Sequence, residues 1–271
     1  MKREQVPDTF GAKNHMKGIF ACAMALLMQP ALAQNDTIVI QPSMVNTAVL
    51  KPGVHRYLVY FQNGKDAPRS KFQLWTRTIS HDKIEGHNAI RIQQEWTDND
   101  TVVHTTNSYS DEKTLQPLYH EFWWKNRDVA KFDYIKKKAW IGSNELTTAD
   151  TSAFKKGILT AFQKSWNQYF LNWHLDLETF PVLPYKEGTT FMINFYDPGF
   201  ATPPQLQPYT VTGSGTLTGY NGEAIECWLL THTSPDNKEV FWVSKKTHEV
   251  LKLEQQYKNL FRYKIKLGFS A

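Results

Sequence analysis

Hydrophobic and polar residues alternate over short stretches of this chain. Tyr57, Val59 and Phe61 would share one face of a strand, and Leu58 and Tyr60 the other. A period of two residues is typical of half-buried β-strands. The stretches that we expect to form strands are 54–61, 72–79, 89–96, 102–110, 118–124 and 129–135, and, in the second half, 191–196, 209–218, 224–231, 239–243, 250–257 and 261–267.

Turn-forming pairs separate these stretches. Asn63-Gly64, Glu85-Gly86 and Asn221-Gly222 are three of them. Glycine and asparagine tolerate the positive φ that tight hairpins require. Short strands joined by short turns predict an antiparallel meander.

The two halves also resemble each other. The pattern T-x-x-x-L-x-x-E begins at Thr114 and again at Thr247, and residues 86–90 resemble 222–225. These landmarks follow the same order at a nearly constant offset. We therefore expect two similar β units, at 51–140 and 186–268.

The period changes between the halves. From Phe154 through Ile158 to Trp173, apolar residues recur every three or four positions. This spacing predicts one long amphipathic helix within 150–175 that connects the units and packs on the sheet.

The first 33 residues have the features of an export signal. Lys17 precedes an apolar run over 18–28, and Ala31-Leu32-Ala33 forms a small-x-small cleavage site. The run is too short to span a bilayer as a helix. Met16 is an alternative start, because 16–33 is a compact signal by itself. We therefore expect an exported protein, periplasmic or extracellular, whose mature chain 34–271 is a single β-rich domain.

Charge and cysteine content exclude several classes of protein. The chain has 31 Lys and Arg against 26 Asp and Glu, and the excess is scattered. We therefore expect no nucleic-acid partner. No later segment is long and apolar enough to be transmembrane. The mature chain keeps only Cys227, so it has no internal disulfide, and a strand-like context predicts that this thiol is buried.

One group of polar residues is a candidate metal site. On a strand, His174, Asp176 and Glu178 would share a face and could bind a metal ion. At the end of a helix they would point in different directions, and the helical pattern that reaches Trp173 favours this second arrangement. The chain lacks the nucleophile-elbow and phosphate-loop patterns. We therefore expect no cofactor and assign no catalytic residue.

Aromatic residues are abundant. They make up 14% of the chain and include nine tryptophans. Large aromatics fill cores, which is the favoured explanation here, but they also line apolar pockets. The candidate ligand-binding residues on this second interpretation are Phe162, Trp166, Trp173 and Trp228.

With these patterns in view, the chain resembles secreted β proteins of the TapB type, in the same broad group as domain-of-unknown-function family 3108. The resemblance lies in residues 109–118 with their counterpart 242–247, and in 183–188 and 195–199. It implies a curved antiparallel sheet or open barrel. More distantly, it extends to the half-barrel carriers that move lipoproteins through the periplasm. It implies no catalytic residue.

The predicted fold is mainly β, a curved antiparallel sheet or open barrel built from two similar units. The predicted function is non-enzymatic binding of an apolar small molecule or lipid in the cell envelope. The alternative is a scaffold or interaction module that contacts another envelope protein. A metal-assisted hydrolase that uses His174, Asp176 and Glu178 ranks third.

Overall fold

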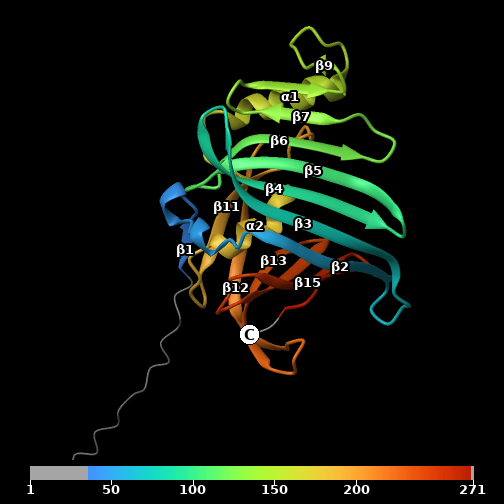
Figure 1. The fold of residues 1–271 in the computed structure, drawn as a ribbon, viewed down its shortest axis with the longest axis vertical. Helices are drawn as coiled ribbons and strands as arrows, with labels where there is room; N and C mark the ends of the chain where they lie inside the picture. The colour runs from blue at the N-terminus through green and yellow to red at the C-terminus, as the bar shows by residue number, and fades with distance from the viewer. Residues whose placement is uncertain (1–35, 270–271) are drawn as a thin grey trace, which may run out of the picture. The chain divides into compact units, whose positions relative to one another are not determined.

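The alternating segments pair with their neighbours in sequence order and form one large open sheet. The computed structural model describes residues 36–269, so the predicted export signal lies outside the described residues. Within them, sixteen strands belong to the sheet, which ends at β1 (Thr37–Val39) on one edge and at β9 (Asn144–Glu145) on the other. The predicted mainly β, open antiparallel architecture is confirmed (Figure 1).

Two antiparallel meanders make up most of this sheet. The strands of the first are β2 (Gly53–Asn63), β3 (Ser70–Ile84), β4 (His87–Asp98), β5 (Thr101–Asp111), β6 (Pro117–Trp124), β7 (Ala130–Asp133), β8 (Lys138–Ile141) and β9. Those of the second are β11 (Thr190–Tyr196), β12 (Gln205–Thr218), β13 (Ala224–Ser234), β14 (Asn237–Ser244), β15 (Val250–Tyr257) and β16 (Leu260–Lys266). The last strand of the second pairs antiparallel with the first strand of the first, where Tyr263 lies opposite Tyr60.

The expected strands all correspond to observed ones, because alternation and turn chemistry are local signals. Glu85, Asn99 and Asn126 adopt positive φ in their turns, as do Gly64 and Gly222. The short strands β1, β8 and β9 were not predicted, since two to four residues carry too little alternation.

The repeated sequence pattern marks the same turn in both meanders. The backbone N–H of Leu115 donates to the carbonyl of Asp111 over 2.9 Å, and that of His248 donates to Ser244 over 2.9 Å. Leu115 and His248 have φ of 57° and 60°. The turn therefore needs a left-handed residue at the same position in each unit.

The connecting segment is only partly helical. The predicted continuous helix is wrong beyond Ser165, where α1 (Ala153–Ser165) ends. The chain continues through β10 (Leu171–Asn172), the 3-10 turn η3 (Trp173–Leu175), α2 (Asp176–Thr179) and η4 (Phe180–Val182). β10 runs parallel to the end of β11, where Leu171 pairs with Phe195. Backbone pairing with a distant strand thus replaces helical hydrogen bonds that the local pattern favoured.

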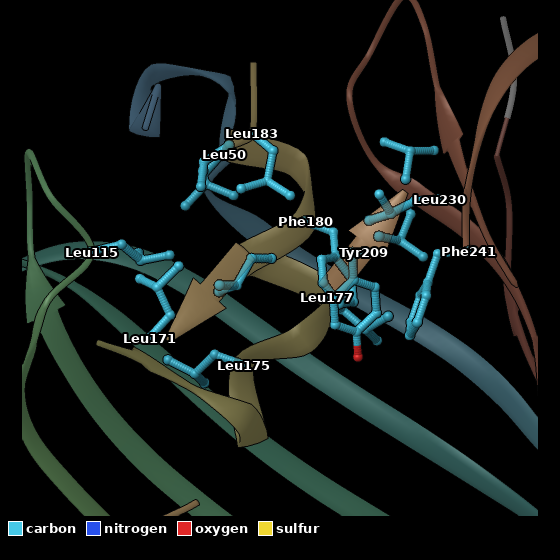
Figure 2. Packing of buried hydrophobic residues seen from close by; sticks show 14 of the residues in the cluster. Leu50, Leu115, Leu171, Leu175, Leu177, Phe180, Leu183, Tyr209, Leu230 and Phe241 are labelled. Carbon is cyan, nitrogen blue, oxygen red and sulfur yellow. The ribbon is translucent and has the colours of Figure 1, made fainter. Parts of the chain in front are cut away.

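Residues 171–183 fill the concave side of the sheet. α2 lies between the strands of the two meanders (Figure 1). Phe180 points toward Tyr209 and Phe241 (Figure 2), with ring centroids 4.8 and 4.4 Å away. The 3-10 turns η1 (Pro42–Met44) and η2 (Thr47–Val49) precede β2, and Leu50 packs into the same core. The centre of the sheet is therefore a packed core.

Two further sequence predictions can be compared with the described residues. Cys227 is fully buried and unpaired, which confirms the predicted buried thiol, and burial raises its pKa to about 11. In residues 36–269, no helix has the length and apolarity needed to cross a bilayer.

Candidate functional site

An apolar pocket opens where the β6–β7 hairpin, α1 and the loop after β11 meet. We call it the rim pocket, and its cavity volume is about 590 Å³. Binding sites for small molecules are commonly apolar clefts of roughly 300–1,000 Å³. The apolar side chains that line it are Phe122, Trp124, Ile141, Phe154, Ile158 and Phe200. Arg127 and Asp128, in the β6–β7 turn, add charged groups.

Strand and helix periods place these side chains on one side. Phe122 and Trp124 are two residues apart on β6 and therefore share a face of the sheet. Phe154 and Ile158 are four residues apart on α1, so they are neighbours on one face of the helix. Ile158 is buried and anchors α1, whereas Phe154 reaches solvent.

The loop after β11 closes the pocket through a glycine. Gly199 has φ of 96°, and a Cβ on it would lie 2.5 Å from the ring of Phe122. Only glycine allows this backbone to approach the aromatic wall. The close approach brings Phe200, the next residue, to the pocket.

Two phenylalanines at the pocket remain largely in water. Phe154 is 62% exposed and Phe200 is 56% exposed. Isolated exposed apolar residues are common, but both of these rings line the same pocket. The pocket therefore combines a cavity with two exposed aromatic side chains, Phe154 and Phe200, which we call its mouth.

A chain of polar side chains lies next to Phe122. The ring of His174 is 5.3 Å from that of Phe122, between centroids. His174 Nδ1 is hydrogen-bonded to His120 Nε2 over 2.9 Å, and His120 Nδ1 to Ser108 Oγ over 2.8 Å. Asp197 Oδ1 is 3.5 Å from His174 Nδ1. We call these four residues the histidine chain.

Burial keeps the two histidines of this chain uncharged at neutral pH. It lowers the pKa of His174 to about 4, even though nearby Asp176 opposes the shift, and it holds the pKa of His120 well below its usual value. It raises the pKa of Asp197 to about 7. The neighbouring His104 stacks on Trp124, and burial lowers its pKa to about 3. The histidines next to Phe122 are therefore neutral at pH 7, whereas Asp197 is partly ionised.

Ion pairs attach α2 to the sheet beside this chain. Arg77, on β3, is fully buried and donates through Nε to Glu178 Oε1 over 2.7 Å, and through Nη2 to the other carboxylate oxygen. Lys264, on β16, donates to Asp176. These contacts fix the short α2 helix, which is too small to be stable alone.

The candidate metal ligands therefore have separate partners. His174 lies in η3 and bonds to His120, Asp176 bonds to Lys264, and Glu178 bonds to Arg77. They do not share the face that a strand would give them. Over residues 36–269, no three or more His, Cys, Asp or Glu side chains are arranged to hold a metal ion.

The four candidate aromatic residues lie apart from the rim pocket. Phe162 is fully buried and Trp166 packs against the same α1 core cluster. Trp173 packs on Phe195, with ring centroids 4.7 Å apart. Trp228 lies under Lys245, whose Nζ is 4.3 Å from the ring centroid. Trp166 also lines a separate depression of about 390 Å³, together with Tyr134 and Phe170.

The sequence reasoning missed the residues that do line the pocket. Phe154 belonged to the predicted helical stripe, but its position at the start of α1 leaves it beyond the core. Phe200 follows Pro198-Gly199, a pair that indicated only a loop. A large apolar residue next to a loop glycine was the one available signal.

Other depressions are weaker candidates. One of about 770 Å³ is lined largely by polar residues of β3–β6, such as Thr76, Gln93 and Asn107, as expected for a solvated sheet face. Another, between η2 and α2, holds about 20 Å³, which is room for a single water.

Comparisons with known proteins identify a family. No curated protein matches the chain. A crystal structure of a β-barrel-like protein of domain of unknown function DUF1849 from Brucella abortus is similar, with 8% sequence identity and a TM-score of 0.38. The match covers 80% of this chain and 97% of that one. The sequence profile of DUF3108, described as a protein family of unknown function, matches residues 56–266, and the chain belongs to that family.

Proposed function

We propose that this is an exported, non-enzymatic protein that binds the apolar part of an amphipathic ligand in the rim pocket. The observation that carries the proposal is the cavity of about 590 Å³ with Phe154 and Phe200 exposed beside it. The signal-like segment 1–33 supports action in the cell envelope.

The binding energy available in the pocket is sufficient for this role. Burying a large apolar side chain contributes about 1.5–3 kcal/mol. Phe154 and Phe200 are more than half exposed, so a ligand that covers both removes much of their surface from water. Contacts with Phe122 and Ile141 would add to this gain.

The surroundings of the pocket favour binding over catalysis. His104 and His120 are fully buried, and His174 lies next to Phe122. A ligand in the pocket would meet aromatic and aliphatic walls before any of these histidines. General acid–base catalysis requires the group to lie within hydrogen-bond reach of the reacting atom.

A fluorescence titration tests the proposal. The hydrophobic probe 1-N-phenylnaphthylamine should bind saturably to the predicted mature chain, 34–271. The double variant Phe154→Ser/Phe200→Ser should bind the probe at least about tenfold more weakly. Phe72→Ser is the matched control, because Phe72 is 47% exposed on β3 and does not line the pocket. Equal affinity of the double variant and the control would overturn the proposal.

Native mass spectrometry of protein purified from the envelope without detergent would then identify the ligand. A reproducible added mass that extracts into organic solvent supports a carrier. The double variant should lose that mass, and Phe72→Ser should keep it.

A scaffold role has less support. Recruiting a partner strand requires an exposed edge of useful length. The edge strands β1 and β9 have three and two residues, a length that blunts such pairing.

A further inference from the structure

We propose that the mouth of the rim pocket docks on an anionic lipid bilayer, so that the ligand passes between membrane and pocket without crossing bulk water. This inference rests on the proposed function and adds the partner surface and its charge.

The apolar component of the surface is aromatic. Phe154 belongs to the first turn of α1 and Phe200 to the loop after β11, two separate elements that line the same cavity. Trp123 and Trp124 of β6 also line it. Peripheral proteins commonly insert exposed phenylalanine and tryptophan into the boundary between headgroups and acyl chains.

The charged component is cationic. Lys125 and Arg127 are exposed in the β6–β7 turn, and Arg127 lines the pocket. Over the described residues, neither of these two side chains has a carboxylate oxygen within 4 Å. Asp128 is the opposing charge at the pocket.

Two lysines on neighbouring strands differ in this respect. Lys131 Nζ lies 3.5 Å from a carboxylate oxygen of Glu121, and Lys138 Nζ lies 3.0 Å from one of Glu145. Their charges are therefore compensated within the protein. The cations around the mouth are left to bind phosphate groups from outside.

Charge of this kind predicts a preference for anionic lipid. Each lysine or arginine close to an anionic membrane surface strengthens binding roughly fivefold at physiological salt. The attraction falls as salt shortens the Debye length. Apolar insertion alone would not distinguish anionic from zwitterionic vesicles.

Vesicle sedimentation tests the inference. The predicted mature chain, 34–271, should bind vesicles of phosphatidylcholine that contain 30% phosphatidylglycerol. It should bind vesicles of pure phosphatidylcholine much more weakly. Its binding to the anionic vesicles should be lost in 0.5 M NaCl. Lys125→Glu/Arg127→Glu should weaken the binding at least about 25-fold. Lys65→Glu/Lys113→Glu, which makes the same charge change at two exposed lysines outside the pocket, should retain it.

The outcomes separate this inference from the proposed function. Equal binding to both kinds of vesicle, or equal loss in both double variants, overturns the docking surface. Retained probe binding with no vesicle binding overturns docking and leaves ligand binding standing. Vesicle binding without probe binding supports docking and removes the pocket as a ligand site.

Discussion

Arg77 and Glu178 lie 101 residues apart and form a buried, bidentate ion pair that joins β3 to α2. Arg77 Nη1 also donates to Gln94 Oε1 over 2.8 Å, and its Nη2 donates to the carbonyl of His174 over 3.1 Å. The guanidinium thus has partners both in the sheet and in residues 171–183, which fill the concave side of the sheet. The pair holds the central core closed next to the histidine chain.

Removing one partner of this ion pair should strongly destabilise the protein. Glu178→Gln is expected to lower the free energy of unfolding by about 3–5 kcal/mol, because the buried charge of Arg77 loses its bidentate partner and keeps only Asp176, 4.0 Å from Nη1. Urea denaturation at pH 7 measures the loss. The exposed pair of Lys138 and Glu145 provides the control, and Glu145→Gln should change stability by less than about 1 kcal/mol.

The double variant Arg77→Met/Glu178→Met separates charge from packing. It should recover most of the lost stability, since apolar groups of similar volume commonly replace buried ion pairs without loss. A double variant as unstable as Glu178→Gln would contradict this explanation.

Asp197 should make stability depend on pH. Burial raises the pKa of its carboxyl to about 7, so between the unfolded pKa near 4 and about 7 the folded protein binds more protons than the unfolded chain. Its contribution to stability therefore falls as pH rises through this window. Its side chain is 36% exposed, so solvent moderates the effect.

Asp197→Asn removes that titration. The free energy of unfolding of this variant, relative to that of the natural chain, should increase between pH 5 and pH 8, as measured by urea midpoints. The buried histidines have the opposite effect, because they lower the stability as pH falls below about 6.5. This effect is common to both proteins, so subtracting the stability of the natural chain from that of the variant at each pH removes it. A difference that stays constant with pH would contradict the assignment.

Gly199→Ala should damage the rim pocket. The added methyl would clash with Phe122 and would sit at a φ of 96°. We expect a loss of about 1–3 kcal/mol in stability and weaker binding of 1-N-phenylnaphthylamine. Gly222→Ala is the matched control, because Gly222 has φ of 83° and nothing within 4 Å of an added Cβ. That variant should show backbone strain and normal probe binding.

The two equivalent turns, at Leu115 and His248, should differ in how much a glycine substitution changes stability. Leu115→Gly removes a buried leucine, which should cost about 2–5 kcal/mol although the left-handed backbone is relieved. His248→Gly relieves the same backbone at a half-buried site and should change stability by less than about 1 kcal/mol. Thermal or urea unfolding of both variants measures the contrast. Equal effects would show that the two turns do not have these distinct roles.

The sequence predicted the parts of this protein that local physics determines. Alternation located the long strands, and Asn-Gly and related pairs located their turns. The pattern that begins at Thr114 and Thr247 identified a shared turn, because its backbone needs the same left-handed residue. The helical stripe located α1 but extended it past Ser165, since the pairing of Leu171 with Phe195 is not visible in a local period.

Only the tertiary structure determined which distant residues meet. Arg77 and Glu178 come together because the sheet curves around α2. Phe122, Phe154 and Phe200 form one pocket because a strand, a helix and a loop converge, with Gly199 allowing the contact. Strands and turns depend on neighbours in sequence, whereas a pocket depends on packing between elements far apart in the chain. The sequence by itself therefore determined the strands, and the packing of those strands determined the candidate site.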